Sequence, residues 1–168
     1  MNQNGNERAE SSPRSVGVNN SIRFPALSFS QGLVALIPSL EVISRCTNLG
    51  FKRGYYKGLF LVDSESRKFQ ISSARKVRRI PFRWTFRDLL ALIDGNPYWE
   101  VELTPAAPTA ISLDEVKGLL FEAFRKEKYS WEAISDFEEF RDKVASSNSI
   151  GELFASFEYF KVGHGGAV

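Results

Sequence analysis

Two apolar, strand-like runs separated by a short polar turn, within residues 54–80, constrain the fold more than any other part of the sequence. The first run, residues 55–62, is rich in aromatic and branched aliphatic side chains. The second, residues 68–71, alternates polar and apolar side chains as a half-buried strand does. Between them, residues 63–66 have the composition of a turn. This stretch predicts a β-hairpin at the centre of a small mixed domain.

Three further segments have patterns that predict strands. Residues 98–103 alternate strictly, with apolar side chains on one face and two glutamates on the other, which indicates a strand near a sheet edge. Residues 40–47 alternate well enough for another strand. Residues 21–38 are apolar but interrupted by proline and glycine, and they predict a strand followed by a short helix. With the hairpin, these segments predict an antiparallel meander of about four strands.

The last third of the chain predicts helices. Three apolar stripes at helical spacing each begin with a capping box, in which a serine precedes a glutamate by three positions. An earlier helix is predicted over residues 86–94, where Thr85 stands at the N-cap position and Gly-Asn-Pro follows. The three capping boxes are Ser112 with Glu115, Ser135 with Glu138, and Ser149 with Glu152.

The order of these elements predicts the fold class and the domain limits. Strands early in the chain and helices late in it are typical of an α+β domain, with the C-terminal helices packed on one face of an antiparallel sheet. A hydrophobic content of 43% in 168 residues is enough for one core. Residues 1–20 are polar and predict a disordered tail, and residues 163–168 predict a flexible one. We therefore expect a single domain over residues 21–162.

The sequence lacks the residues that catalytic, metal and cofactor sites require. Cys46 is the only cysteine and His164 the only histidine, so neither a zinc site nor an internal disulfide is expected. His164 lies in a glycine-rich stretch that does not hold a general base in place. The paired carboxylates stand in predicted first helical turns, where acids favour the helix dipole. We expect no catalytic residues, no metal and no cofactor.

Compartment and membrane association follow from the same composition. One cysteine in 168 residues is typical of a reducing compartment. The longest apolar stretch, near residues 33–37, is too short to span a bilayer. We expect a soluble cytoplasmic protein.

Charge is distributed unevenly although the net charge is only +2. Residues 66–86 contain seven basic residues and no acid, whereas residues 111–160 contain eleven acids and six bases. Such a run indicates a surface for an acidic partner, and tyrosines near it add contact area. The alternative is that the run is simply solvated and that these arginines pair with the acidic helices of the same chain. The candidate binding residues are Tyr55, Tyr56, Arg67, Arg75, Lys76, Arg78, Arg79 and Arg83.

These features favour a protein-binding module over an enzyme. In size, composition and absence of catalytic motifs the chain resembles bacterial immunity proteins and other toxin-neutralising modules, although no family motif is matched. The resemblance implies electrostatic masking of a partner's charged site. One alternative is a nucleic-acid-binding protein that uses residues 67–83. Another is an enzyme with a carboxylate site that the sequence does not reveal.

Overall fold

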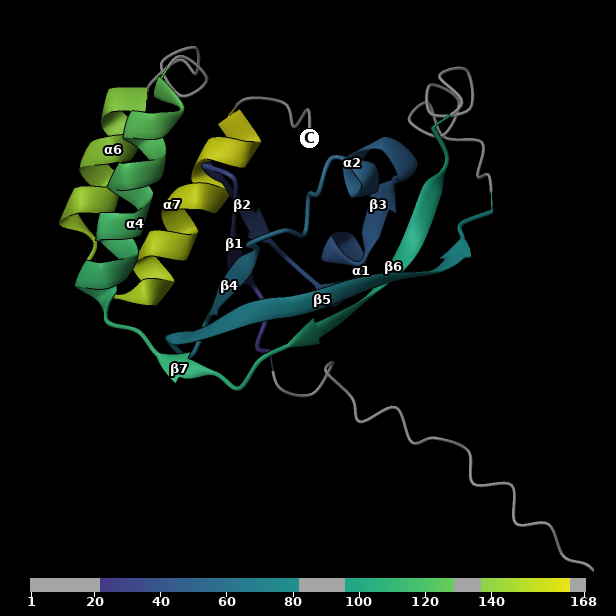
Figure 1. Ribbon diagram of the computed structural model, residues 1–168. Helices are drawn as coiled ribbons and strands as arrows, with labels where there is room; N and C mark the ends of the chain where they lie inside the picture. The colour runs from purple at the N-terminus through teal and green to yellow at the C-terminus, as the bar shows by residue number, and fades with distance from the viewer. Residues whose placement is uncertain (1–21, 82–95, 129–136, 164–168) are drawn as a thin grey trace, which may run out of the picture.

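The computed structural model describes residues 22–81, 96–128 and 137–163. Its elements confirm a mixed α+β protein with an antiparallel sheet and helices (Figure 1). The strands are β1 Ala26–Ser30, β2 Leu33–Ile37, β3 Arg45–Thr47, β4 Phe60–Asp63, β5 Arg67–Arg79, β6 Tyr98–Pro105 and β7 Thr109–Ala110. The helices are α1 Leu40–Ile43, α2 Asn48–Lys52, α4 Leu113–Lys126, α6 Phe137–Ser146 and α7 Ile150–Gly163.

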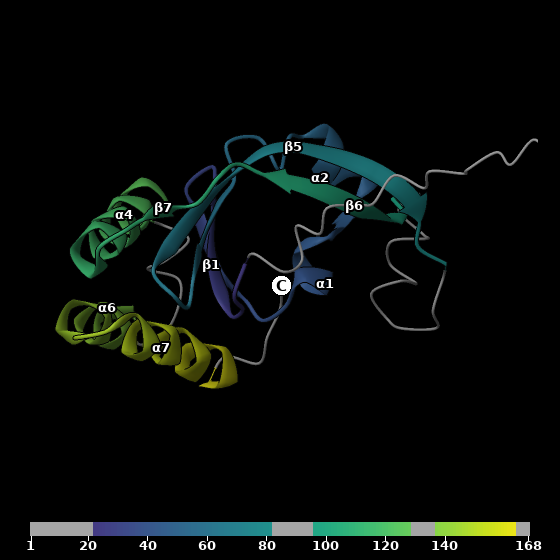
Figure 2. The same ribbon diagram turned by 90° about the horizontal axis from the view of Figure 1, so that it is seen from below.

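The sheet is larger than the sequence predicted. Among the described residues it has seven strands rather than about four, in the order β2-β1-β4-β5-β6-β3, with β7 paired to β5 off this path. Strand β5 is 13 residues long and pairs with β4 through its first half and with β6 through its second half. Two register shifts in the β5–β6 pairing accompany its curvature. The sheet therefore curves into a half-barrel (Figure 2).

Two hydrophobic cores lie on opposite faces of this curved sheet. Leu27, Phe29 and Val62 pack against α4, α6 and α7 in the first core. Their neighbours Ala26 and Leu61 point the other way, into a second core that Ile43 of α1 and residues of β5 and β6 complete. Because both faces are covered at β1, all five of its residues are buried. The three long helices therefore cover one end of the sheet only, as Figures 1 and 2 show.

The C-terminal helices begin as predicted where the structure describes their start. Ser112 Oγ accepts from the Glu115 amide at 3.2 Å and the Glu115 carboxylate accepts from the Ser112 amide at 2.8 Å, a complete capping box. Ser149 Oγ accepts from the Glu152 amide at 3.1 Å. The predicted N-cap Ser135 lies outside the described residues. None of the described helices has the length and apolar character needed to cross a membrane.

Two predictions for the N-terminal half are wrong. Residues 21–38, predicted as a strand followed by a short helix, instead contain two strands, because residues 33–37 are β2, which pairs with β1 through a two-residue turn. Gln31 and Gly32 in that turn have φ values of 51° and 86°, the left-handed backbone that a tight hairpin needs. Residues 40–47, predicted as one strand, divide into α1 and the three-residue β3. The apolar alternation there fits a single helical turn equally well.

The central hairpin is confirmed with different limits. Residues 55–58, predicted as strand, form turns, and the first strand begins only at Phe60. The predicted meander is also wrong, because β3 pairs with β6 and not with the hairpin. Strand β6 is confirmed, and it lies next to β3, the last strand of the sheet order, which pairs with residues 98–100 only. The helix predicted over residues 86–94 and the tail predicted over residues 1–20 lie outside the described residues.

Candidate functional site

Arg67, one of the predicted binding residues, is committed to a buried carboxylate of its own chain. Asp63 at the end of β4 is fully buried. Its Oδ2 accepts from Arg67 Nη2 at 2.6 Å and from Nε at 3.0 Å. Its Oδ1 accepts from the backbone amides of Glu65 and Arg67, both at 3.0 Å. The hydrogen bond to Asp63 raises the pKa of Arg67. This arginine therefore fixes the β4–β5 turn.

Arg75 and Arg78 are paired with acids across the β5–β6 ladder. Arg75 stands opposite Glu102 and its guanidinium lies 2.5 Å from that carboxylate. Arg78 stands opposite Glu100 and donates to it through Nε. These pairs are exposed, and they cover the outer face of the sheet with alternating charge. Arg75 and Arg78 therefore pair within the chain, but with acids of β6 and not with the acidic helices that the alternative named.

Lys76 belongs to the opposite, inner face of the same strand. Its Nζ lies 4.8 Å from the ring centroid of Phe51 and 5.0 Å from that of Trp99. It also donates to Asn48 Oδ1 on α2. No acid among the described residues pairs with it, so its charge is held by two aromatic faces and one amide. The ammonium is half-buried.

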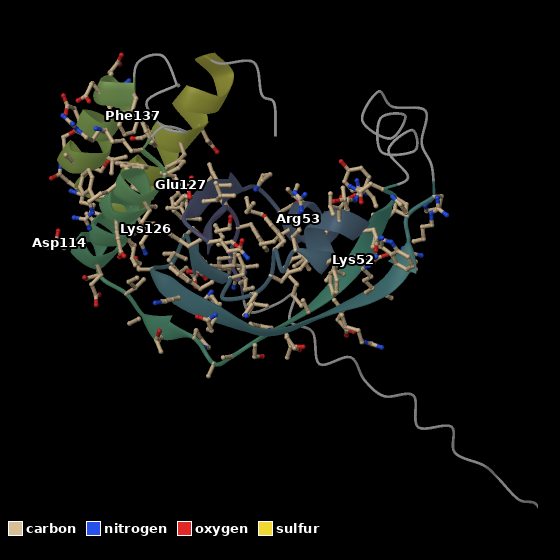
Figure 3. The ribbon with its side chains drawn as sticks, turned by 45° about the horizontal axis from the view of Figure 1, so that its top comes forward. Lys52, Arg53, Asp114, Lys126, Glu127 and Phe137 are labelled. Atoms are coloured by element: carbon tan, nitrogen blue, oxygen red, sulfur yellow. The ribbon has the colours of Figure 1, made fainter. Side chains whose placement is uncertain are left out.

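Four exposed cations continue from Lys76 across α2 and the following loop. Lys52 and Arg53 end α2, Lys57 lies in the loop, and Arg79 stands opposite Trp99 at the end of β5. Figure 3 shows Lys52 and Arg53 on α2, away from Asp114 of α4. None of the four has an ion pair with another described residue. We call the set the cationic patch: Lys52, Arg53, Lys57, Lys76 and Arg79.

The two predicted tyrosines lie beneath this patch. Tyr56 is only 6% exposed and its hydroxyl donates to the Ile43 carbonyl at 2.8 Å. Tyr55 is half-buried, with its ring edge against Tyr56 at 5.0 Å between centroids. Burial raises the pKa of both phenols and of the nearby Cys46 thiol, which is hydrogen-bonded to Tyr56. These side chains support α2 from inside and present little surface to a partner.

A surface cleft beside α1 has no catalytic arrangement among its lining residues. It has a volume of about 420 Å³ beside α1 and the ends of β5 and β6. Its charged walls are two ion pairs, Glu41 with Arg45 and Glu100 with Arg78, so each carboxylate already has a guanidinium partner. Ser44 is the hydroxyl in its lining, and no histidine lines it. Within residues 22–81, 96–128 and 137–163, no three Asp, Glu, His or Cys side chains come close enough to hold a metal.

The structure thus places only some of the predicted binding residues in the cationic patch, and it adds residues that were not predicted. Lys76 and Arg79 join the patch, and Arg83 lies outside the described residues. Sequence reasoning missed Lys52, Arg53 and Lys57. A signal was present, because residues 42–62 contain four basic residues and no acid. That second basic run was overlooked because its charges are spread over a region read as a strand.

Comparisons with known proteins add no family or fold to this description. No protein-family model matches the chain, and neither the curated proteins nor the solved structures gave a significant match.

Proposed function

We propose that the protein is a non-enzymatic binding module that recognises an acidic surface on another protein through the cationic patch. The observation that carries the proposal is that Lys52, Arg53, Lys57 and Arg79 are exposed and have no ion pair among the described residues. Most other exposed arginines of the sheet are paired with glutamate. Unpaired charges gathered on one face favour an oppositely charged partner and speed its association.

Helix-dipole stabilisation does not account for the whole patch. Cations at a helix C-terminus are favoured by the dipole, which explains Lys52 and Arg53 in part. Helix α2 has only five residues, however, and Lys57 and Arg79 are not on a helix. The patch also includes Leu49, an apolar side chain that is 44% exposed three and four positions before the two cations. Charge around an exposed apolar side chain is typical of protein interfaces.

Nucleic-acid binding is the alternative that the same charges support. Binding of single strands uses exposed aromatic faces on which bases stack. Here the ring faces of Phe51 and Trp99 are both engaged by Lys76, and Tyr56 is buried. Among the described residues, the patch therefore offers phosphate contacts but few open ring faces for stacking, which favours a protein partner. Within that class we propose neutralisation of a toxin, in which the patch covers an acidic functional surface.

A matched pair of charge reversals tests the proposal. K52E/R53E alters two adjacent cations at the C-terminal end of α2, and R125E/R141E makes the same change of charge at two exposed positions of α4 and α6 that lie outside the patch. Each variant and the wild type are used as bait in nuclease-treated native lysate, and a 20-nucleotide single strand is titrated separately. We expect one protein to be retained by wild type and R125E/R141E and lost from K52E/R53E.

Two results would refute this function. Retention of the same proteins by all three baits shows that the cationic patch is not an interface. Binding of the single strand by the wild type, with an affinity that falls steeply as salt rises and is lost in K52E/R53E, shows that the partner is nucleic acid.

A further inference from the structure

A second, smaller groove adjoins the cationic patch. It lies between the tip of the β1–β2 hairpin, the start of β4 and the last turns of α4, with a volume of about 120 Å³. Its apolar lining includes Leu33, Phe60 and Leu119. Leu33 is 55% exposed, the highest value among the large hydrophobic side chains that the structure describes. An exposed leucine at the mouth of an apolar groove indicates a contact surface.

The groove and the patch share one loop. The Gly54 carbonyl accepts from Gln31 Nε2 at 3.0 Å, and the Tyr55 carbonyl accepts from Ser30 Oγ at 2.6 Å. These bonds attach the loop of residues 53–58 to the hairpin tip. The loop carries Arg53 and Lys57, and its last residue, Gly58, lines the groove. A partner seated on the patch therefore reaches the groove without a gap.

The groove accepts a side chain and is too small for a larger ligand. Sites for drug-sized molecules have volumes of about 300–1,000 Å³, whereas a cavity of about 150 Å³ holds one benzene ring. The ions at its rim, Glu122 and Lys126, lie 2.7 Å apart and neutralise each other. The hydrogen bond from Lys126 lowers the pKa of Glu122, so this pair stays ionised at neutral pH. The polar side chains of Ser30 and Gln31 in the lining already donate to the loop carbonyls, so the apolar part of the lining remains for recognition.

We propose that this groove receives one apolar side chain, Leu, Phe or Met, from an acidic segment of the partner that binds the cationic patch. The inference rests on the proposed function, because the patch supplies the acidic character of the segment. Leu33 then forms part of the apolar wall that the partner's side chain contacts. The charges of the patch attract and orient the acidic segment, and the groove fixes the position of its apolar side chain.

A display library of random 12-residue peptides, selected on the whole protein, tests this inference. We expect selected peptides to combine Asp and Glu with one Leu, Phe or Met at a fixed position. Fluorescence anisotropy of a selected peptide then measures affinity for variants. L33S should weaken binding about tenfold and L33M should preserve it, because methionine refills the same volume. V77S is the matched control, since Val77 is 53% exposed on β5 and lies outside the groove lining.

The outcomes separate the two proposals. Acidic peptides that lose affinity for K52E/R53E but bind L33S normally overturn the groove and leave the proposed function standing. Apolar peptides without acids, sensitive to L33S alone, overturn the proposed function and the acidic segment with it. If selection enriches neither acidic nor apolar residues, both proposals are overturned. If sedimentation shows a dimer of the wild type that L33S abolishes, a second copy fills the groove and the inference fails.

Discussion

Removal of the Asp63 carboxylate tests whether Arg67 is structural. Asp63 is fully buried and satisfies three backbone amides, those of Arg23, Glu65 and Arg67, as well as the Arg67 guanidinium. In D63A the three amides lose their acceptor. At about 1 kcal/mol for each hydrogen bond, the loss in unfolding free energy is about 3 kcal/mol. A protein of this size loses about 2–4 °C in Tm per kcal/mol, so Tm should fall by roughly 6–12 °C.

The isosteric D63N variant makes this prediction more specific. An asparagine retains one carbonyl oxygen for the amides of Glu65 and Arg67, but its NH₂ group faces the donors of Arg23 and Arg67. We expect D63N to lie between wild type and D63A in urea denaturation. S64A is the control, because Ser64 is exposed and makes only a 3.4 Å contact with the Arg23 carbonyl. A Tm of D63A within about 2 °C of S64A would refute the reasoning.

The two remaining predictions concern the first cap of α4 and the buried cysteine. S112A should lose about 1 kcal/mol of unfolding free energy at neutral pH. Its stability should also fall less than that of the wild type as the pH is lowered. The hydrogen bonds from Ser112 lower the pKa of Glu115 from 4.5. The cap therefore stabilises the fold above that pH, and this stabilisation is lost as the pH falls through the folded-state pKa. Urea denaturation at about pH 7 and about pH 3 measures both effects. Burial raises the pKa of the Cys46 thiol. At about pH 8 a thiol reagent should therefore label Cys46 only after unfolding. Labelling of the native protein within seconds would contradict its burial.

Elements whose ends have local signals were predicted well. The start of α4 depends on Ser112 and Glu115, three residues apart, and the strand at β6 was predicted from the alternation over residues 98–103. Sheet order has no such local signal. Strand β3 is three residues long and pairs with a strand more than 50 positions later. The β1–β2 hairpin was not predicted, because its Gln-Gly turn is a weaker sequence signal than Asn-Gly.

Charge pairing was the hardest part to predict from the sequence. Arg75 and Glu102 are 27 positions apart, so no helical or neighbouring spacing connects them. Their pairing requires the exact β5–β6 register, including the bulge between Lys76 and Arg78. A shift of one residue would move each arginine to the other face. The sequence could therefore show that the run is basic but not which of its charges are neutralised.

The alternation of β6 explains which cations stay unpaired. Its acids, Glu100 and Glu102, both point to the outer face, and the arginines opposite them on β5 are neutralised there. Its inward residues are apolar, so Lys76 and Arg79 meet Val101 and Trp99 and find no carboxylate. Residues 42–62, which include α2, contain no acid that could supply one locally. Among the described residues, strand alternation thus places the acids of β6 on the face opposite Lys76 and Arg79, which leaves these two cations unpaired.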